Sequence, residues 1–98
     1  MAIMLSVETQ GVGQEKYDAV MKEMGLTKKG AKWPKGILSH TAGAIPGGWL
    51  VVDVWESEAA AGKFQQTMLQ PAFQKVGGMP EPRMTIAKVH YSYSAKKK

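Results

Sequence analysis

The pattern of apolar and polar residues along the chain predicts four strands and two helices. Four segments have the apolar runs or the alternation of strands: residues 2–8, 37–44, 49–56 and 83–91. Apolar residues at i, i+3, i+4 and i+7 over 17–24 predict an amphipathic helix that Gly25 ends. A second helix follows Ser57, a favourable N-cap. Pro71 is expected to kink this helix or to begin a short extra turn that carries Phe73.

This order of elements predicts a fold of the α+β class. Strand–helix–strand–strand–helix–strand is the ferredoxin-like βαββαβ arrangement, a four-stranded antiparallel sheet with two helices on one face. The strand at 49–56 is apolar on both faces, since Leu50, Val52 and Val54 alternate with Val51 and Trp55. The face without helices therefore needs cover, and we expect a homodimer in which a second copy provides it.

The turn at residues 45–48 predicts how the two central strands pair. Pro46 and Gly47 are turn-forming residues, and we place them at the middle of a hairpin. Directly opposed residues have Cβ atoms about 4.5–5.5 Å apart. Three opposed pairs then share one face of the sheet: His40 with Asp53, Leu38 with Trp55, and Ala42 with Val51.

His40 and Asp53 are the candidate catalytic residues. A carboxylate on one imidazole nitrogen fixes the tautomer and leaves the other nitrogen as a proton acceptor. The pair could thus act as a general base toward a phenol or an enolisable ketone. Tyr17, on the inner face of the first helix, and Trp55 are the candidate substrate-binding residues. Purely structural roles stay open: a buried pair that fixes strand register, and two core aromatic residues.

Length and composition define the class of protein further. The 98 residues are expected to form one domain over 1–98. Cysteine is absent, so there are no disulfides, and two histidines without cysteine predict no metal site. No cofactor is expected. No apolar run is long enough to span a membrane and no signal peptide is evident, so we expect a cytoplasmic protein without a membrane partner.

The net charge of +5 comes from two lysine clusters. Lys96, Lys97 and Lys98 are expected to form a disordered tail. Four lysines (Lys28, Lys29, Lys32, Lys35) surround Trp33 in a stretch without acidic residues. An aromatic ring among cations can stack a base, yet the rest of the chain has more acidic than basic residues. The charge therefore does not favour a nucleic acid as partner.

Three segments resemble a known superfamily: the hairpin from Ser39 to Glu58, then Leu69-Gln70-Pro71-Ala72 and Pro80-Glu81-Pro82. They are similar to small dimeric α/β-barrel proteins of the antibiotic-biosynthesis-monooxygenase-like superfamily, many of which have no assigned function. The resemblance implies two sheets paired into a barrel, with a ligand cavity between each sheet and its own helices. Some members oxidise polycyclic phenols with O₂ and no cofactor, some degrade haem, and others resemble isomerases. Its cofactor-free monooxygenases often use an asparagine near a tryptophan, and this chain has no asparagine.

Three hypotheses about function follow. The first is a monooxygenase-like or isomerase-like enzyme, or a binding protein, that takes a small aromatic or enolisable molecule in a cavity between sheet and helices. The second is a non-catalytic, stress-related or interaction protein whose core is packed solid, with no pocket of ligand size. The third is a nucleic-acid binder that uses Trp33 and the lysines around it.

Overall fold

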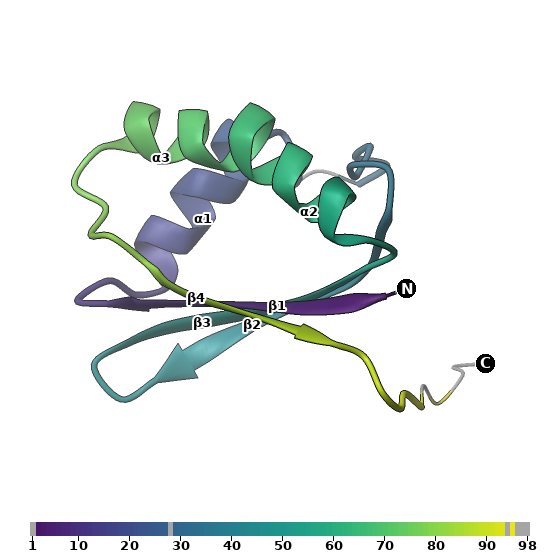
Figure 1. Cartoon of the computed structure of the whole chain (residues 1–98). Coiled ribbons are helices and arrows are strands. Elements are labelled where there is room, and N and C mark those ends of the chain that lie inside the picture. The colour runs from purple at the N-terminus through teal and green to yellow at the C-terminus, as the bar shows by residue number, and fades with distance from the viewer. Residues whose placement is uncertain (1, 28, 94, 96–98) are drawn as a thin grey trace.

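The strands and helices of the chain follow one another in the predicted order (Figure 1). A computed structural model describes residues 2–27, 29–93 and 95, so the expected tail at 96–98 lies outside the described residues. The elements are β1 (Ile3–Gln10), α1 (Gln14–Glu23), β2 (Ile37–Ile45), β3 (Gly48–Trp55), α2 (Glu58–Phe64), the π-helical turn η1 (Gln65–Leu69), α3 (Gln70–Val76) and β4 (Arg83–Lys88).

The four strands form one antiparallel sheet in the order β2-β3-β1-β4. The second helical segment consists of α2, η1 and α3 (residues 58–76). Figure 1 shows that α1 and this segment cover the same face of the sheet and leave the other face bare. This is the ferredoxin-like βαββαβ fold, as the sequence predicted. None of the helices in the described ranges is long and apolar enough to cross a membrane.

The core lies between the sheet and the second helical segment. Alternate residues of β1 point toward the helices and are buried, among them Leu5 and Val7. They pack with Trp55 from β3 and with Ala61 and Phe64 from α2. The strand period of two therefore directs one row of side chains from each central strand into a common core.

The second helical segment begins as predicted and passes Pro71 without ending. The Ser57 side chain accepts a hydrogen bond from the backbone N–H of Ala60 at 3.1 Å, which caps α2. The π-helical turn η1 precedes Pro71, which then lies in the first turn of α3 with Phe73 behind it. A wider turn at this place suits proline, which donates no hydrogen bond and crowds the preceding carbonyl.

The hairpin register agrees with the prediction near the turn and departs from it at one end. His40 is paired with Asp53 and Ala42 with Val51, as expected. The predicted pairing of Leu38 with Trp55 is wrong, because an irregularity between Ile37 and Ser39 places Ile37 opposite Trp55. This bulge lets Ile37 pack against the core and leaves Leu38 60% exposed.

The last strand is shorter than predicted and forms one edge of the sheet. It ends at Lys88 rather than at residue 91. Lys88 is paired with Ile3, the first residue of β1, and the backbone N–H of Val89 still donates to the carbonyl of Ala2 at 3.0 Å. All six residues of β4 are exposed in the single chain.

Candidate active site between the sheet and the helices

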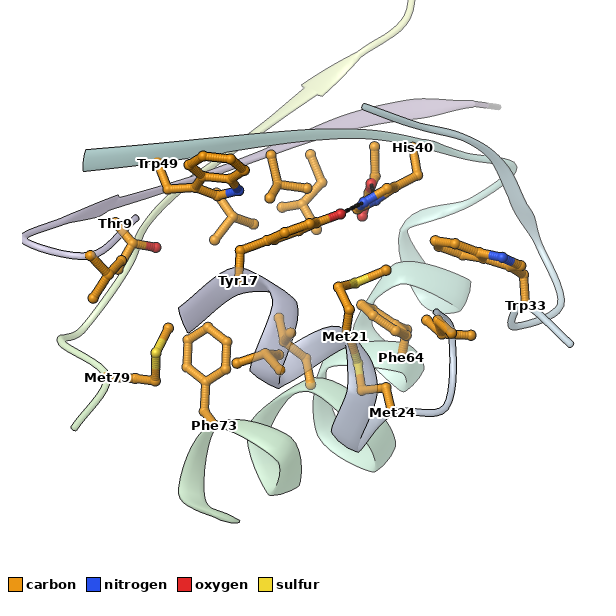
Figure 2. A pocket seen from close by; sticks show the side chains of 18 residues that line it. Thr9, Tyr17, Met21, Met24, Trp33, His40, Trp49, Phe64, Phe73 and Met79 are labelled. Atoms are coloured by element: carbon orange, nitrogen blue, oxygen red, sulfur yellow. Dashed lines mark hydrogen bonds and ion pairs between the residues drawn. The ribbon is translucent and has the colours of Figure 1, made fainter. Parts of the chain in front are cut away.

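A cavity of about 60 Å³ lies between the sheet and the helices (Figure 2). One water molecule needs roughly 10–15 Å³ on this scale, so the cavity has room for a few. Most of the residues that line the cavity are apolar. They come from β1, β2, β3, α1, the second helical segment and the loop that carries Trp33, which we call the Trp33 loop (residues 27–36). The structure therefore has a cavity at the place where the small-molecule hypothesis expects one, with His40 in its wall.

Three polar side chains from three elements form a hydrogen-bonded chain in this wall. Nδ1 of His40 lies 2.6 Å from Oδ1 of Asp53, and Nε2 of His40 lies 2.6 Å from Oη of Tyr17. The hairpin register brings the histidine and the carboxylate together. Tyr17 reaches them from α1, and Figure 2 shows its hydroxyl directed at His40.

The chemistry of the groups fixes the direction of these hydrogen bonds. An ionised carboxylate only accepts hydrogen bonds, so Nδ1 of His40 donates to Asp53. Nε2 of the neutral imidazole is then an acceptor, and the Tyr17 hydroxyl donates to it. Asp53 is only 4% exposed, so the histidine is the main partner that offsets the cost of burying this charge. The lone pairs of Tyr17 Oη remain available to a ligand.

Tyr17 keeps its proton at neutral pH. Burial raises the pKa of its hydroxyl above the ordinary value of 10.0, and the negative charges of Asp53 and Asp18 raise it further. The hydroxyl is therefore a hydrogen-bond donor to His40 rather than a phenolate.

Aromatic rings surround the hydrogen-bonded side chains of Asp53, His40 and Tyr17. The Tyr17 ring lies 5.2 Å from the ring of Trp49 and 6.1 Å from that of His40, centroid to centroid. The ring of Trp33 lies 5.0 Å from the imidazole on another side. Apolar and aromatic walls with a few polar groups are typical of sites for small flat molecules.

Sequence reasoning missed Trp49 and the inward position of Trp33. Trp49 shares the strand face of Val51 and Asp53, so the predicted alternation of β3 could have placed it in the site. No comparable signal exists for Trp33, because its loop has no period from which a direction can be inferred.

The structure places Trp55 away from the other predicted site residues. It is 0% exposed, packs against Phe64 with ring centroids 5.1 Å apart, and does not line the cavity. Among the candidates, the structure thus joins Tyr17, His40 and Asp53, and puts Trp55 in the core. The indole N–H groups of Trp49 and Trp55 are both buried without a hydrogen-bond partner in the described part of the chain.

No group of three or more histidine, cysteine, aspartate or glutamate side chains suited to hold a metal ion occurs in residues 2–27, 29–93 and 95. The imidazole and the carboxylate at the site are already bonded to each other.

Solved structures share the architecture at low sequence identity. Rv0793 from Mycobacterium tuberculosis is 11% identical with a TM-score of 0.72, over 96% of this chain and 100% of its own. SnoaB, a cofactor-independent oxygenase from Streptomyces nogalater, is 10% identical with a TM-score of 0.63, over 93% of this chain and 94% of its own. A monooxygenase from the gene ActVA-Orf6 of Streptomyces coelicolor, in complex with nanaomycin D, is 20% identical with a TM-score of 0.60, over 97% of this chain and 93% of its own.

The chain has the antibiotic-biosynthesis-monooxygenase-like fold. This agrees with the resemblance seen in the sequence, and identities of this size establish the fold alone. No family model and no curated protein matches the chain. A shared fold does not establish a function, which depends on the residues of the site.

Proposed function

We propose that the chain binds a small aromatic or enolisable molecule in the cavity and removes a proton from it. The observation that carries this proposal is the unbroken hydrogen-bond chain from Asp53 through His40 to Tyr17 in an apolar wall. A general base needs a proton acceptor within hydrogen-bond reach of the substrate, directly or through one intermediate group. Here the intermediate group is the Tyr17 hydroxyl.

The proton moves in one relay. The acidic proton of the ligand, which is on the hydroxyl of a phenol or on the carbon beside the carbonyl of a ketone, faces Oη of Tyr17. As the tyrosine passes its own proton to Nε2 of His40, its oxygen takes the proton of the ligand. The products are a ligand anion, a neutral tyrosine and an imidazolium. The carboxylate of Asp53, 2.6 Å from Nδ1, stabilises the new positive charge.

Two reactions begin with such an anion. An electron-rich phenolate can reduce O₂, the co-substrate of a cofactor-free oxygenase, and an enolate that is reprotonated at another carbon gives an isomer. The similarity in fold to a cofactor-independent oxygenase supports the first. The absence of asparagine removes a residue that such oxygenases often use. The proposal is therefore the proton abstraction that both reactions share.

The proposed unit is a homodimer. Met4 is exposed on the face of the sheet that lacks helices, and Leu50, Val52 and Val54 of β3 alternate onto the same face, where they are half-buried. A second sheet laid on this face would bury these side chains and stabilise a chain whose own core is small.

The test uses 4-nitrophenol, whose phenolate absorbs visible light. Below the pH at which free 4-nitrophenol ionises, the protein should bind it partly as the phenolate, so a visible band appears on binding. We expect His40→Gln to abolish the band and Tyr17→Phe to weaken it. Thr41→Ala is the matched control, because Thr41 is next to His40 on β2 but on the opposite face of the sheet.

An undiminished phenolate band in His40→Gln would overturn the relay. Absence of 4-nitrophenol binding at millimolar concentration to the wild-type protein would contradict the assignment of the cavity as the ligand site.

A further inference from the structure

A groove on the surface meets the cavity at two shared residues. Trp33 and His40 line the cavity, and both also line a separate, more open groove of about 290 Å³. The other walls of this groove are Ile37, Leu38 and Ser39 at the start of β2. The cavity and the groove therefore adjoin at the histidine of the proposed relay.

The bulge in β2 shapes the place where the groove meets the cavity. It turns the side chain of Leu38 outward, where it is 60% exposed, and Trp33 beside the groove is 38% exposed. Figure 2 shows Trp33 entering the site from its loop on the side of His40. An exposed leucine and an exposed tryptophan beside a buried polar chain mark a place where an apolar molecule can enter.

The Trp33 loop is strongly cationic. Lys29, Lys32 and Lys35 are exposed, and residues 27–36 contain no acidic residue. In the part of the chain that the structure describes, none of the three forms an ion pair with a carboxylate. Lys32 directly precedes Trp33 and Lys35 is two residues before Ile37, so both charges are near residues that line the groove. The Glu56 carboxylate lies beside Gly36 and offsets part of this charge, and the remaining positive charge attracts anions to the groove.

We propose that the ligand enters through this groove and carries an anionic substituent, such as a carboxylate, that remains beside Lys32 and Lys35 while its ring enters the cavity. This inference rests on the proposed function, since it names the substrate class of the same site. Tyr17, which receives the acidic O–H in the relay, lines the cavity but not the groove, whereas His40 lines both. The O–H is therefore deeper than the anionic group, which is on the part of the ring nearer to the groove, as in a hydroxyaryl carboxylate.

A small anion explains the loop better than a polynucleotide does. Trp33 lines the cavity and its ring lies 5.0 Å from the imidazole of His40, centroid to centroid. The ring already packs on the imidazole, and this contact competes with the stacking of a base.

The experiment compares salicylate with its neutral analogue salicylamide by calorimetry at low and high salt. Lys32→Gln/Lys35→Gln removes the two charges closest to Trp33 in the sequence. Arg83→Gln/Lys88→Gln removes two charges from β4, which lies at the sheet edge opposite β2, and is the matched control. We expect the loop variant to bind salicylate about three- to tenfold more weakly, as two partly screened ion pairs imply. Binding of salicylamide should change less than about twofold, and added salt should reduce the loss.

The outcomes separate this inference from the proposed function. Equal binding of salicylate by the wild-type protein and the loop variant would overturn the anionic substituent and leave the proton relay in place. An equal loss in the β4 variant would also overturn it, because net charge rather than the groove would then be responsible. Binding of neither probe would overturn both proposals.

Discussion

His40 and Asp53 lie directly opposite each other on β2 and β3, and their side chains are joined by a 2.6 Å hydrogen bond. This one pairing creates the polar part of the site. It orients the imidazole so that Nε2 faces the hydroxyl of Tyr17, also at 2.6 Å. Because Asp53 is buried, its charge acts on the histidine with little screening from water.

Asp53→Asn is expected to abolish proton abstraction while it preserves the shape of the site. The amide of asparagine can donate to Nδ1, which would place the ring proton on Nε2 and remove the acceptor for Tyr17. We expect the fraction of bound 4-nitrophenol that is ionised to fall by about tenfold or more, which corresponds to one pKa unit of lost stabilisation. The visible 4-nitrophenolate band measures this fraction. An unchanged band in a folded Asp53→Asn protein would show that the carboxylate only fixes the register.

Tyr17 is expected to ionise at a higher pH than an ordinary tyrosine. Burial and the charges of Asp53 and Asp18 raise its pKa above 10.0. A folded-state pKa above the unfolded value means that the proton is held more tightly in the folded state. Its contribution to stability is therefore complete below about pH 10 and is lost as the pH rises through the folded-state pKa.

Tyrosinate absorbance measures this directly. Tyr17→Phe should remove a titration step above the ordinary pKa of 10.0, and Tyr91→Phe, the control, should leave that step in place. Loss of the same step in both variants would contradict the buried position of the Tyr17 hydroxyl.

Trp55→Phe is expected to affect stability but not ligand binding. The side chain is fully buried against Phe64 and lies outside the cavity wall. Loss of volume should lower the free energy of unfolding by about 1–2 kcal/mol, partly offset because an unpaired indole N–H is removed. Denaturant unfolding and 4-nitrophenol binding measure the two effects. A large loss of affinity would restore the role predicted for Trp55 from the sequence.

Val54→Lys is expected to dissociate the proposed dimer. A lysine on the face without helices would bury a charge between two sheets, which is costly without a partner. Light scattering should show a monomer for this variant and a dimer for the wild-type protein. Gln66→Lys, which adds the same charge at an exposed position of η1, is the control and should stay dimeric. A monomeric wild-type protein would contradict the barrel.

Gly48→Ala is expected to destabilise the hairpin next to the site. A Cβ at Gly48 would lie 2.3 Å from the backbone oxygen of Thr9, closer than real atoms approach. The strands would have to separate, which should cost about 2 kcal/mol or more, as overpacking does. Gly43→Ala is the control, because a Cβ there meets no atom within 4 Å. Equal unfolding midpoints for the two variants would contradict the close approach of β1 and β3 at this point.

The sequence by itself determined the order of the elements and the central pairing of the site. Strand alternation, the helical period and the Pro46-Gly47 turn are local signals in the sequence. In an antiparallel hairpin, the position of the turn fixes which residues are opposed, and here it pairs His40 with Asp53. The sheet-facing position of Tyr17 on its helix also follows from the helical period.

Only the tertiary structure decided which of these side chains meet. The bulge at Leu38 shifted the far end of β2 by one residue, because Ile37 packs better against the core. Trp55, although on the same face as Asp53, is covered by Phe64, and Trp33 and Trp49 border the cavity instead. These outcomes depend on how α1, α2 and a loop without periodicity pack over the sheet, and side-chain packing between distant segments leaves no local pattern in a sequence.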